Sequence, residues 1–181
     1  MKFNIALKFL LFLPLISCVN LSWAQDDEVT TIDTAFVKSE INRLLLVYSD
    51  SGNVDVVKYL LDNGANLNDT SDDGVTALMY ASQAGSYSIV KMLLERGADP
   101  NMIPFDGNTA LHAAVRIGND SIAELLIKNR AKVNCANNLG LTPLHYAVWY
   151  GYPYLTDLLI YYGANVNAQD ALGCTPLFLS T

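Results

Sequence analysis

Apolar residues recur along the chain in short runs that are separated by polar stretches containing glycine. Paired Leu and Ile residues share one phase in the four most regular runs, at 60–61, 93–94, 126–127 and 159–160. Each pair predicts the buried face of a helix, since apolar residues gather on one side of a short amphipathic helix. A Thr-Ala or Thr-Pro step opens the preceding segment and predicts another helix, because Thr can cap it and Pro is tolerated in the first turn. The pattern therefore predicts pairs of short helices.

The same pattern repeats with a period of 33 residues. Four other sets of identical residues keep this step: Thr76, Thr109, Thr142 and Thr175; Gly52, Gly85, Gly118 and Gly151; Gly74, Gly107, Gly140 and Gly173; and Asn68, Asn101, Asn134 and Asn167. A period of this length is typical of a solenoid, in which each unit buries its apolar face against its neighbours.

Glycines punctuate each period where the backbone needs positive φ. Gly74 and its equivalents predict a tight turn, and Gly64, Gly97 and Gly163 predict the left-handed residue that ends a helix. Arg130 replaces this last glycine in the third period. We expect a left-handed arginine there, at a cost of about 1 kcal/mol relative to glycine.

The sequence inside each period resembles the ankyrin repeat family. The matching segments are DGNTALHAA (106–114), LGLTPLHYA (139–147), VKMLLERGADPN (90–101) and LLIYYGANVN (158–167). The resemblance covers residues 39–181. It implies an all-α repeat solenoid of helix–loop–helix units joined by β-hairpin fingers, and a protein-binding scaffold with no chemistry of its own.

We expect a linker and the start of a helix over 25–38, followed by five units of the ankyrin domain. These units are a cap-like repeat (39–68), three complete repeats (69–101, 102–134 and 135–167) and a partial repeat (168–181). With only a partial last repeat, the second helix of the fourth, with Leu155 and Leu159, is expected to lack its usual neighbour. Three explanations of this edge stay open: a partner covers it, the chain belongs to a longer array, or the end of the helix frays.

The N-terminus has the pattern of an export signal. Lys2 and Lys8 precede an apolar stretch over 9–19 that is too short to span a bilayer. Small residues at Ser22 and Ala24 predict a signal peptide over 1–24. Alternatively, the segment ending at Cys18 resembles a bacterial lipoprotein box and predicts a lipidated Cys18 on a membrane surface; an uncleaved anchor is a third reading.

Charge and composition exclude several classes. The chain has 11 basic and 18 acidic residues, and its net charge of −7 argues against a nucleic-acid partner. A hydrophobic fraction of 51% excludes wholesale disorder. His112 and His145 occupy the same repeat position, and we expect each imidazole to tie a finger to a helix by hydrogen bonds. Neither has the nearby ligands that a metal site requires, so we expect no metal, no cofactor and no enzymatic activity.

Two cysteines follow the export signal, Cys135 and Cys174. We expect them to stay unbonded, because stacked repeats lie on the order of 10 Å apart and a disulfide needs Cα atoms within roughly 7 Å.

The resemblance also implies where a partner protein docks, namely on the fingers and the exposed side of each first helix. Carried over to this sequence, these positions predict a binding patch of Phe105, Arg116, Ile117, Leu139, Leu141, Trp149, Tyr150 and Leu172. The equivalent positions of the second repeat, among them Asp72 and Asp73, are polar and acidic. Packing of Trp149 between repeats is the alternative interpretation.

These features together predict an exported, non-enzymatic ankyrin protein of bacterial type, periplasmic or secreted, that binds another protein. It would inhibit, protect or chaperone that protein. The alternatives are a structural homo-oligomer joined through the uncovered C-terminal edge, and a secreted effector that binds a host protein.

Overall fold

The computed structural model describes residues 34–180, with side chains over 35–178. The expected signal peptide, Cys18 and residues 25–33 of the expected linker lie outside these residues. Within them, the helices are α2 (Thr34–Asp50), α3 (Val54–Asp62), α4 (Ala77–Gln83), α5 (Tyr87–Glu95), α6 (Ala110–Arg116), α7 (Asp120–Lys128), α8 (Pro143–Trp149), α9 (Pro153–Tyr161) and the 3-10 helix η2 (Pro176–Ser180). None of the described helices is long and apolar enough to cross a membrane.

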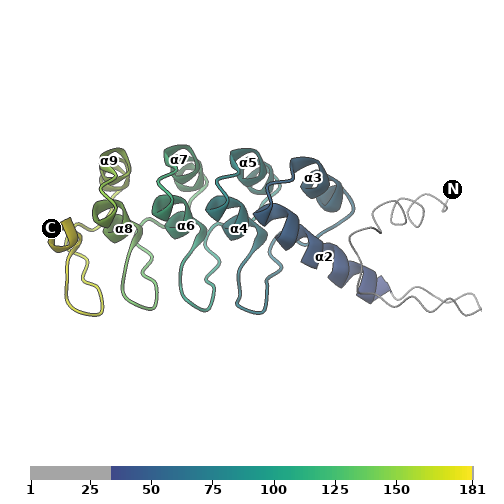
Figure 1. The fold of residues 1–181 in the computed structure, drawn as a ribbon, viewed down its shortest axis with the longest axis horizontal. Helices are drawn as coiled ribbons and strands as arrows, with labels where there is room; N and C mark the ends of the chain where they lie inside the picture. Colours follow the sequence, from purple (N-terminus) through teal and green to yellow (C-terminus); the bar gives the residue numbers. More distant parts are fainter. Residues whose placement is uncertain (1–33, 181) are drawn as a thin grey trace, which may run out of the picture. The chain divides into compact units, whose positions relative to one another are not determined.

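The helices form two rows, as the helical repeat solenoid predicts. The first helices of the repeats, α2, α4, α6 and α8, pack in succession and are followed by η2. The second helices, α3, α5, α7 and α9, pack in succession behind them. Figure 1 shows these two rows and the loops that project from the first-helix row, which we call the fingers.

Several helices begin where a side chain caps the first turn. Thr76 stands before α4, and its hydroxyl accepts a hydrogen bond from the Met79 N–H at 3.3 Å. Asn119 stands before α7, and its Oδ1 accepts from the Ile122 N–H at 3.0 Å. These bonds satisfy amide groups that have no partner within the helix.

The turns depend on positive φ, and two of them also depend on the absence of a side chain. A Cβ on Gly107 would lie 2.8 Å from the Cα of Asn137, and one on Gly140 would lie 2.8 Å from the Ala171 amide nitrogen. Successive fingers therefore approach each other as closely as only glycine allows. Arg130 has a φ of 70°, which confirms the expected left-handed arginine at the end of α7.

The expected β-hairpin form of the fingers is not confirmed. Among residues 34–180 the strand pairing is a single isolated bridge between Thr70 and Thr76. A backbone hydrogen bond joins each finger to the next. These bonds run from Phe105 N to Asp73 O, from Asn138 N to Asp106 O, and from Ala171 N to Leu139 O, at 2.9, 3.1 and 2.9 Å. The fingers therefore form a connected row.

The C-terminal edge differs from the expectation. Leu155 and Leu159 are fully buried, so their assignment to the uncovered edge was wrong. Both belong to the core, because α9 packs against α7 and α8. Ile160 is the uncovered residue, with 45% of its surface exposed. The three residues at its repeat position, Leu61, Leu94 and Ile127, are only 7–8% exposed, since a further second helix covers each of them.

Candidate protein-binding surface

Four tyrosine and tryptophan rings lie together at the C-terminal end of α8. The ring of Tyr150 lies 6.3 Å from that of Tyr146, 6.0 Å from Trp149 and 5.9 Å from Tyr152, centroid to centroid. The planes of Tyr146 and Trp149 lie within 10° of the plane of Tyr150. We call Tyr146, Trp149, Tyr150 and Tyr152 the aromatic platform. Trp149 is 56% exposed and Tyr150 is 46% exposed, so the platform faces solvent and Trp149 does not pack between repeats.

The platform rests on the preceding repeat. A Cβ on Gly118 would lie 2.8 Å from Cζ of Tyr152, so the Tyr152 ring covers the loop between α6 and α7. Hydrogen bonds to two finger residues fix Tyr146: its hydroxyl accepts from Asn137 Nδ2 at 3.2 Å and donates to Asn108 Oδ1 at 3.4 Å. Burial raises the pKa of Tyr146, which keeps this hydroxyl protonated. Two members of the platform are therefore fixed before any partner arrives.

The two histidines have the structural role that the sequence predicts. In His112, Nδ1 accepts from the Thr109 N–H at 3.1 Å, so the ring proton lies on Nε2 and is donated to the Leu141 carbonyl at 3.1 Å. His145 makes the same bonds to the Thr142 N–H and the Cys174 carbonyl. Each imidazole thus joins the start of a first helix to the finger of the next repeat. Burial lowers the pKa of His112 to about 4.

Most of the predicted patch is exposed to solvent. Phe105, Leu139 and Leu172 are exposed on three successive fingers. Ile117 is exposed beside Arg116 at the end of α6, and Arg116 donates to Gln83 Oε1 of α4 at 3.1 Å. Exposed apolar side chains of the predicted patch therefore come from the third, fourth and fifth repeats.

Leu141 is the exception, and its assignment to the exposed patch was wrong. Only 7% of its surface is exposed. Its amide donates to Asn137 Oδ1, its carbonyl accepts from Asn137 N, and the same carbonyl accepts from His112 Nε2, at 3.0, 2.9 and 3.1 Å. These bonds hold the returning limb of the finger against the helices. Val75, Asn108 and Cys174, at the same repeat position, are also at least partly buried.

The sequence interpretation missed Tyr146 and Tyr152 as parts of the surface. Tyr146 and Tyr150 are four residues apart, the spacing that places two side chains on one face of a helix. That spacing was the available signal for Tyr146. The seat of Tyr152 on Gly118 depends on contact between repeats, which no local pattern gives.

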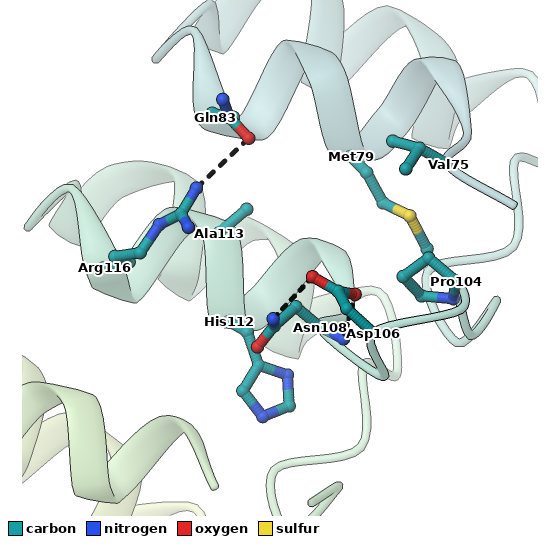
Figure 2. Close-up of a pocket in the computed structure, with 9 residues that line it drawn as sticks. All are labelled: Val75, Met79, Gln83, Pro104, Asp106, Asn108, His112, Ala113 and Arg116. Atoms are coloured by element: carbon teal, nitrogen blue, oxygen red, sulfur yellow. Dashed lines mark hydrogen bonds between the residues drawn. The ribbon is translucent and has the colours of Figure 1, made fainter. Parts of the chain in front are cut away.

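A small cavity lies between α4, α6 and the finger of the third repeat. Figure 2 shows it, lined by Met79, Pro104 and Asp106 among others, with Arg116 reaching toward Gln83. Its volume of about 100 Å³ is below the 300 Å³ or so that small-molecule sites occupy. Asp106 accepts from both the main-chain and side-chain nitrogens of Asn108, at 2.9 and 2.7 Å, so its carboxylate serves the turn.

Residues 34–180 contain no group of three His, Cys, Asp or Glu side chains that could hold a metal ion. Cys135 and Cys174 are half-buried free thiols. The described surface thus offers apolar contact area and hydrogen-bonding groups.

The comparison with known families agrees with this architecture. The curated proteins include no significant match to the chain. The family model described as ankyrin repeats (3 copies) matches residues 33–104 and 102–170, which together make up most of the chain. The chain belongs to the ankyrin repeat family.

Proposed function

We propose that this protein is a non-enzymatic scaffold that binds another protein through the aromatic platform and the apolar fingers beside it. Ankyrin repeats are typically non-enzymatic domains that mediate protein–protein interaction. The observation that carries the proposal is the stacked and exposed pair Trp149 and Tyr150. Exposed apolar patches mark interaction sites, and Trp and Tyr dominate binding energies at protein interfaces.

The geometry of the surface supports this function. Tyr146 and Tyr152 are fixed by hydrogen bonds and packing, so little side-chain entropy remains to be lost there on binding. Phe105, Leu139 and Leu172 extend the contact across three linked fingers. A surface of this kind suits a folded protein or an extended segment better than a small molecule.

We further propose that residues 1–24 direct export, to the periplasm or out of the cell, with lipidation at Cys18 as the alternative. In that compartment the scaffold would inhibit, protect or chaperone its partner, or act as an effector on a host protein. Intact-mass analysis of the exported protein tests the first step, with Gln25 or a diacylated Cys18 expected as the first residue. A product that retains Met1 would contradict export by cleavage.

The function itself is tested by truncating two anchors in different repeats, Trp149→Ala together with Phe105→Ala. Capture of the partner from an extract of the exporting compartment should weaken about a thousandfold, at roughly 2 kcal/mol for each anchor. The matched control is Tyr161→Ala with Tyr87→Ala, which truncates exposed aromatics on the second-helix row. Full capture by the first variant, with circular dichroism unchanged, would refute the assignment.

The second candidate is self-assembly through the C-terminal edge, and the exposure of Ile160 favours it. Here Ile160→Asp is the appropriate change, because the buried Leu155 and Leu159 cannot be altered without disturbing the core. If this candidate is right, sedimentation should show an oligomer that Ile160→Asp dissociates and that the Trp149→Ala, Phe105→Ala variant leaves intact.

A further inference from the structure

Paired and unpaired charges are distributed unevenly over the described residues. The second-helix row carries the pairs Lys91–Glu95 and Lys128–Glu124, and Arg96 pairs with Asp62 between α5 and α3. On the opposite side, Arg43 of α2 is held by both carboxylate oxygens of Glu40, at 2.9 and 2.6 Å.

Four aspartates near the finger of residues 69–76 form no ion pair within residues 34–180. They are Asp50, Asp69, Asp72 and Asp73. Their charges are therefore available to a partner, and Glu40 already neutralises the nearby Arg43.

Three of these aspartates border a groove between α2 and the finger of residues 69–76. The groove has a volume of about 470 Å³, and Asp50, Asp69 and Asp72 line it together with Leu46 and Val47. One cation, Arg43, also lines the groove, and its guanidinium is paired with Glu40. Lys38 does not line it. A lysine or arginine fits such a groove, because its methylene stem can lie on apolar surface while its charged end reaches a carboxylate.

The middle of the first-helix side carries little net charge. Arg116 donates to Gln83, and Asp106, the charged group nearest to it in the cavity, is held by Asn108. Charge on this side is therefore concentrated at the second repeat, and apolar surface is concentrated at the aromatic platform of the fourth.

We propose that the partner presents a polypeptide segment that is basic at one end and apolar or aromatic at the other. Its basic end lies in the groove beside Asp50 and Asp72, and its apolar end lies on the aromatic platform. The inference rests on the proposed function, and it adds the chemistry and the direction of the bound segment.

The proposal also predicts how far apart the basic and the apolar ends of the segment lie. Neighbouring helices lie roughly 8–10 Å apart, so the groove and α8 are separated by roughly 16–30 Å. An extended chain rises roughly 3.3 Å per residue, which puts the two ends about 5–9 residues apart.

The test is a selection of random 16-residue peptides displayed on phage against the purified chain. We expect the enriched peptides to carry Lys or Arg at one end and apolar or aromatic residues at the other, with that spacing. The affinity of the best synthetic peptide is then measured by calorimetry on variants. Asp72→Lys with Asp73→Lys should weaken it about tenfold, and more at low salt, since exposed charges act over a screened range.

The matched control is Glu95→Lys with Asp157→Lys, which makes the same change in net charge at exposed sites on the second helices. It should change the affinity less than twofold. Equal weakening by both variants would overturn the inference, because net charge alone would then explain the effect. Circular dichroism checks that each variant is folded.

Failure of this inference is distinguishable from failure of the proposed function. If the peptides have no excess of Lys or Arg, or if Asp72→Lys with Asp73→Lys has no effect, while Trp149→Ala still weakens binding, the basic partner is refuted and the binding surface stands. If Trp149→Ala leaves the peptide affinity unchanged, the platform itself is refuted. A selection that enriches no peptide counts against both.

Discussion

The third and fourth repeats have nearly the same framework, yet they differ in what covers them. Ile127 and Val133 of the third repeat are buried, whereas Ile160 and Val166, at the same positions of the fourth, are about half exposed. The difference arises because α9 covers α7, whereas no described second helix follows α9. Burial at a repeat position is therefore a property of the neighbouring unit as much as of the residue itself.

The two repeats also differ at the exposed ends of their first helices, where the repeat pattern requires no particular residue. Arg116 and Ile117 end the first helix of the third repeat, and Trp149 and Tyr150 occupy the same places in the fourth. These side chains contribute little to the core, and under the proposed function they decide what the surface binds. The common framework therefore fixes the position of the surface, and a few exposed residues fix its chemistry.

The largest expected effect concerns His112, whose ring joins the third repeat to the fourth through the Leu141 carbonyl. Burial lowers its pKa from 6.5 to about 4, so between these values the unfolded chain binds more protons than the folded one. The free energy of unfolding should fall as the pH falls through this window, by about 3 kcal/mol in total. Urea unfolding between pH 7 and pH 4 measures it.

Carboxylates titrate near the lower end of the same window, so a variant must isolate the histidine. His112→Gln keeps a side-chain donor and acceptor but does not titrate. It should be less stable at pH 7 and should show a flatter dependence on pH. An unchanged slope would mean that protonation of His112 does not loosen the junction between the repeats.

The next prediction compares the same change in the two repeats. Ile127→Ala and Ile160→Ala remove identical atoms at equivalent positions, from a covered and from an uncovered environment. We expect Ile127→Ala to cost about 2 kcal/mol more, because it alone leaves a cavity between packed helices. Urea unfolding of the two variants gives the difference. Equal losses would show that the edge of α9 is covered in solution, as the self-assembly candidate requires.

The framework was predictable from the sequence because it is local and periodic. Thr76 predicts the start of a helix, because Thr is a common N-cap residue. Gly74 predicts a tight turn, because glycine readily adopts positive φ. Burial that depends on another unit was harder to predict. Leu141 was expected at the surface and is buried, because its backbone is bonded to Asn137 and to His112 of the previous repeat.

The uncovered edge was harder for the same reason. Among the described residues no second helix follows α9, and the exposed apolar residue there is Ile160 rather than Leu155 or Leu159. The difference depends on which side of α9 faces the adjacent helices. Half of the aromatic platform was predicted. Trp149 and Tyr150 stood at the docking positions that the resemblance implies, whereas Tyr146 and Tyr152 did not.

The smallest expected effect on stability comes from exchanging the residues that end the second helices of the two repeats. Arg130 ends α7 at a φ of 70°, and Gly163 ends α9 at 87° with nothing within 4 Å of a Cβ placed there. Arg130→Gly should therefore stabilise the chain by about 1 kcal/mol or slightly less, since glycine relieves left-handed strain but is freer in the unfolded chain. Asn101 Nδ2 donates to the Arg130 carbonyl, and this bond survives because it involves only the backbone of residue 130.

The reciprocal change, Gly163→Arg, should destabilise by a similar amount, because there is room for the side chain and the backbone strain remains. Thermal unfolding of both single variants and of the double variant measures the exchange, and the double variant should lie close to the parent because the two sites are separate. If Arg130→Gly instead destabilises the chain, the arginine side chain contributes more through its own contacts than its backbone conformation costs. The third repeat would then owe part of its stability to the one residue where it departs from the pattern of the fourth.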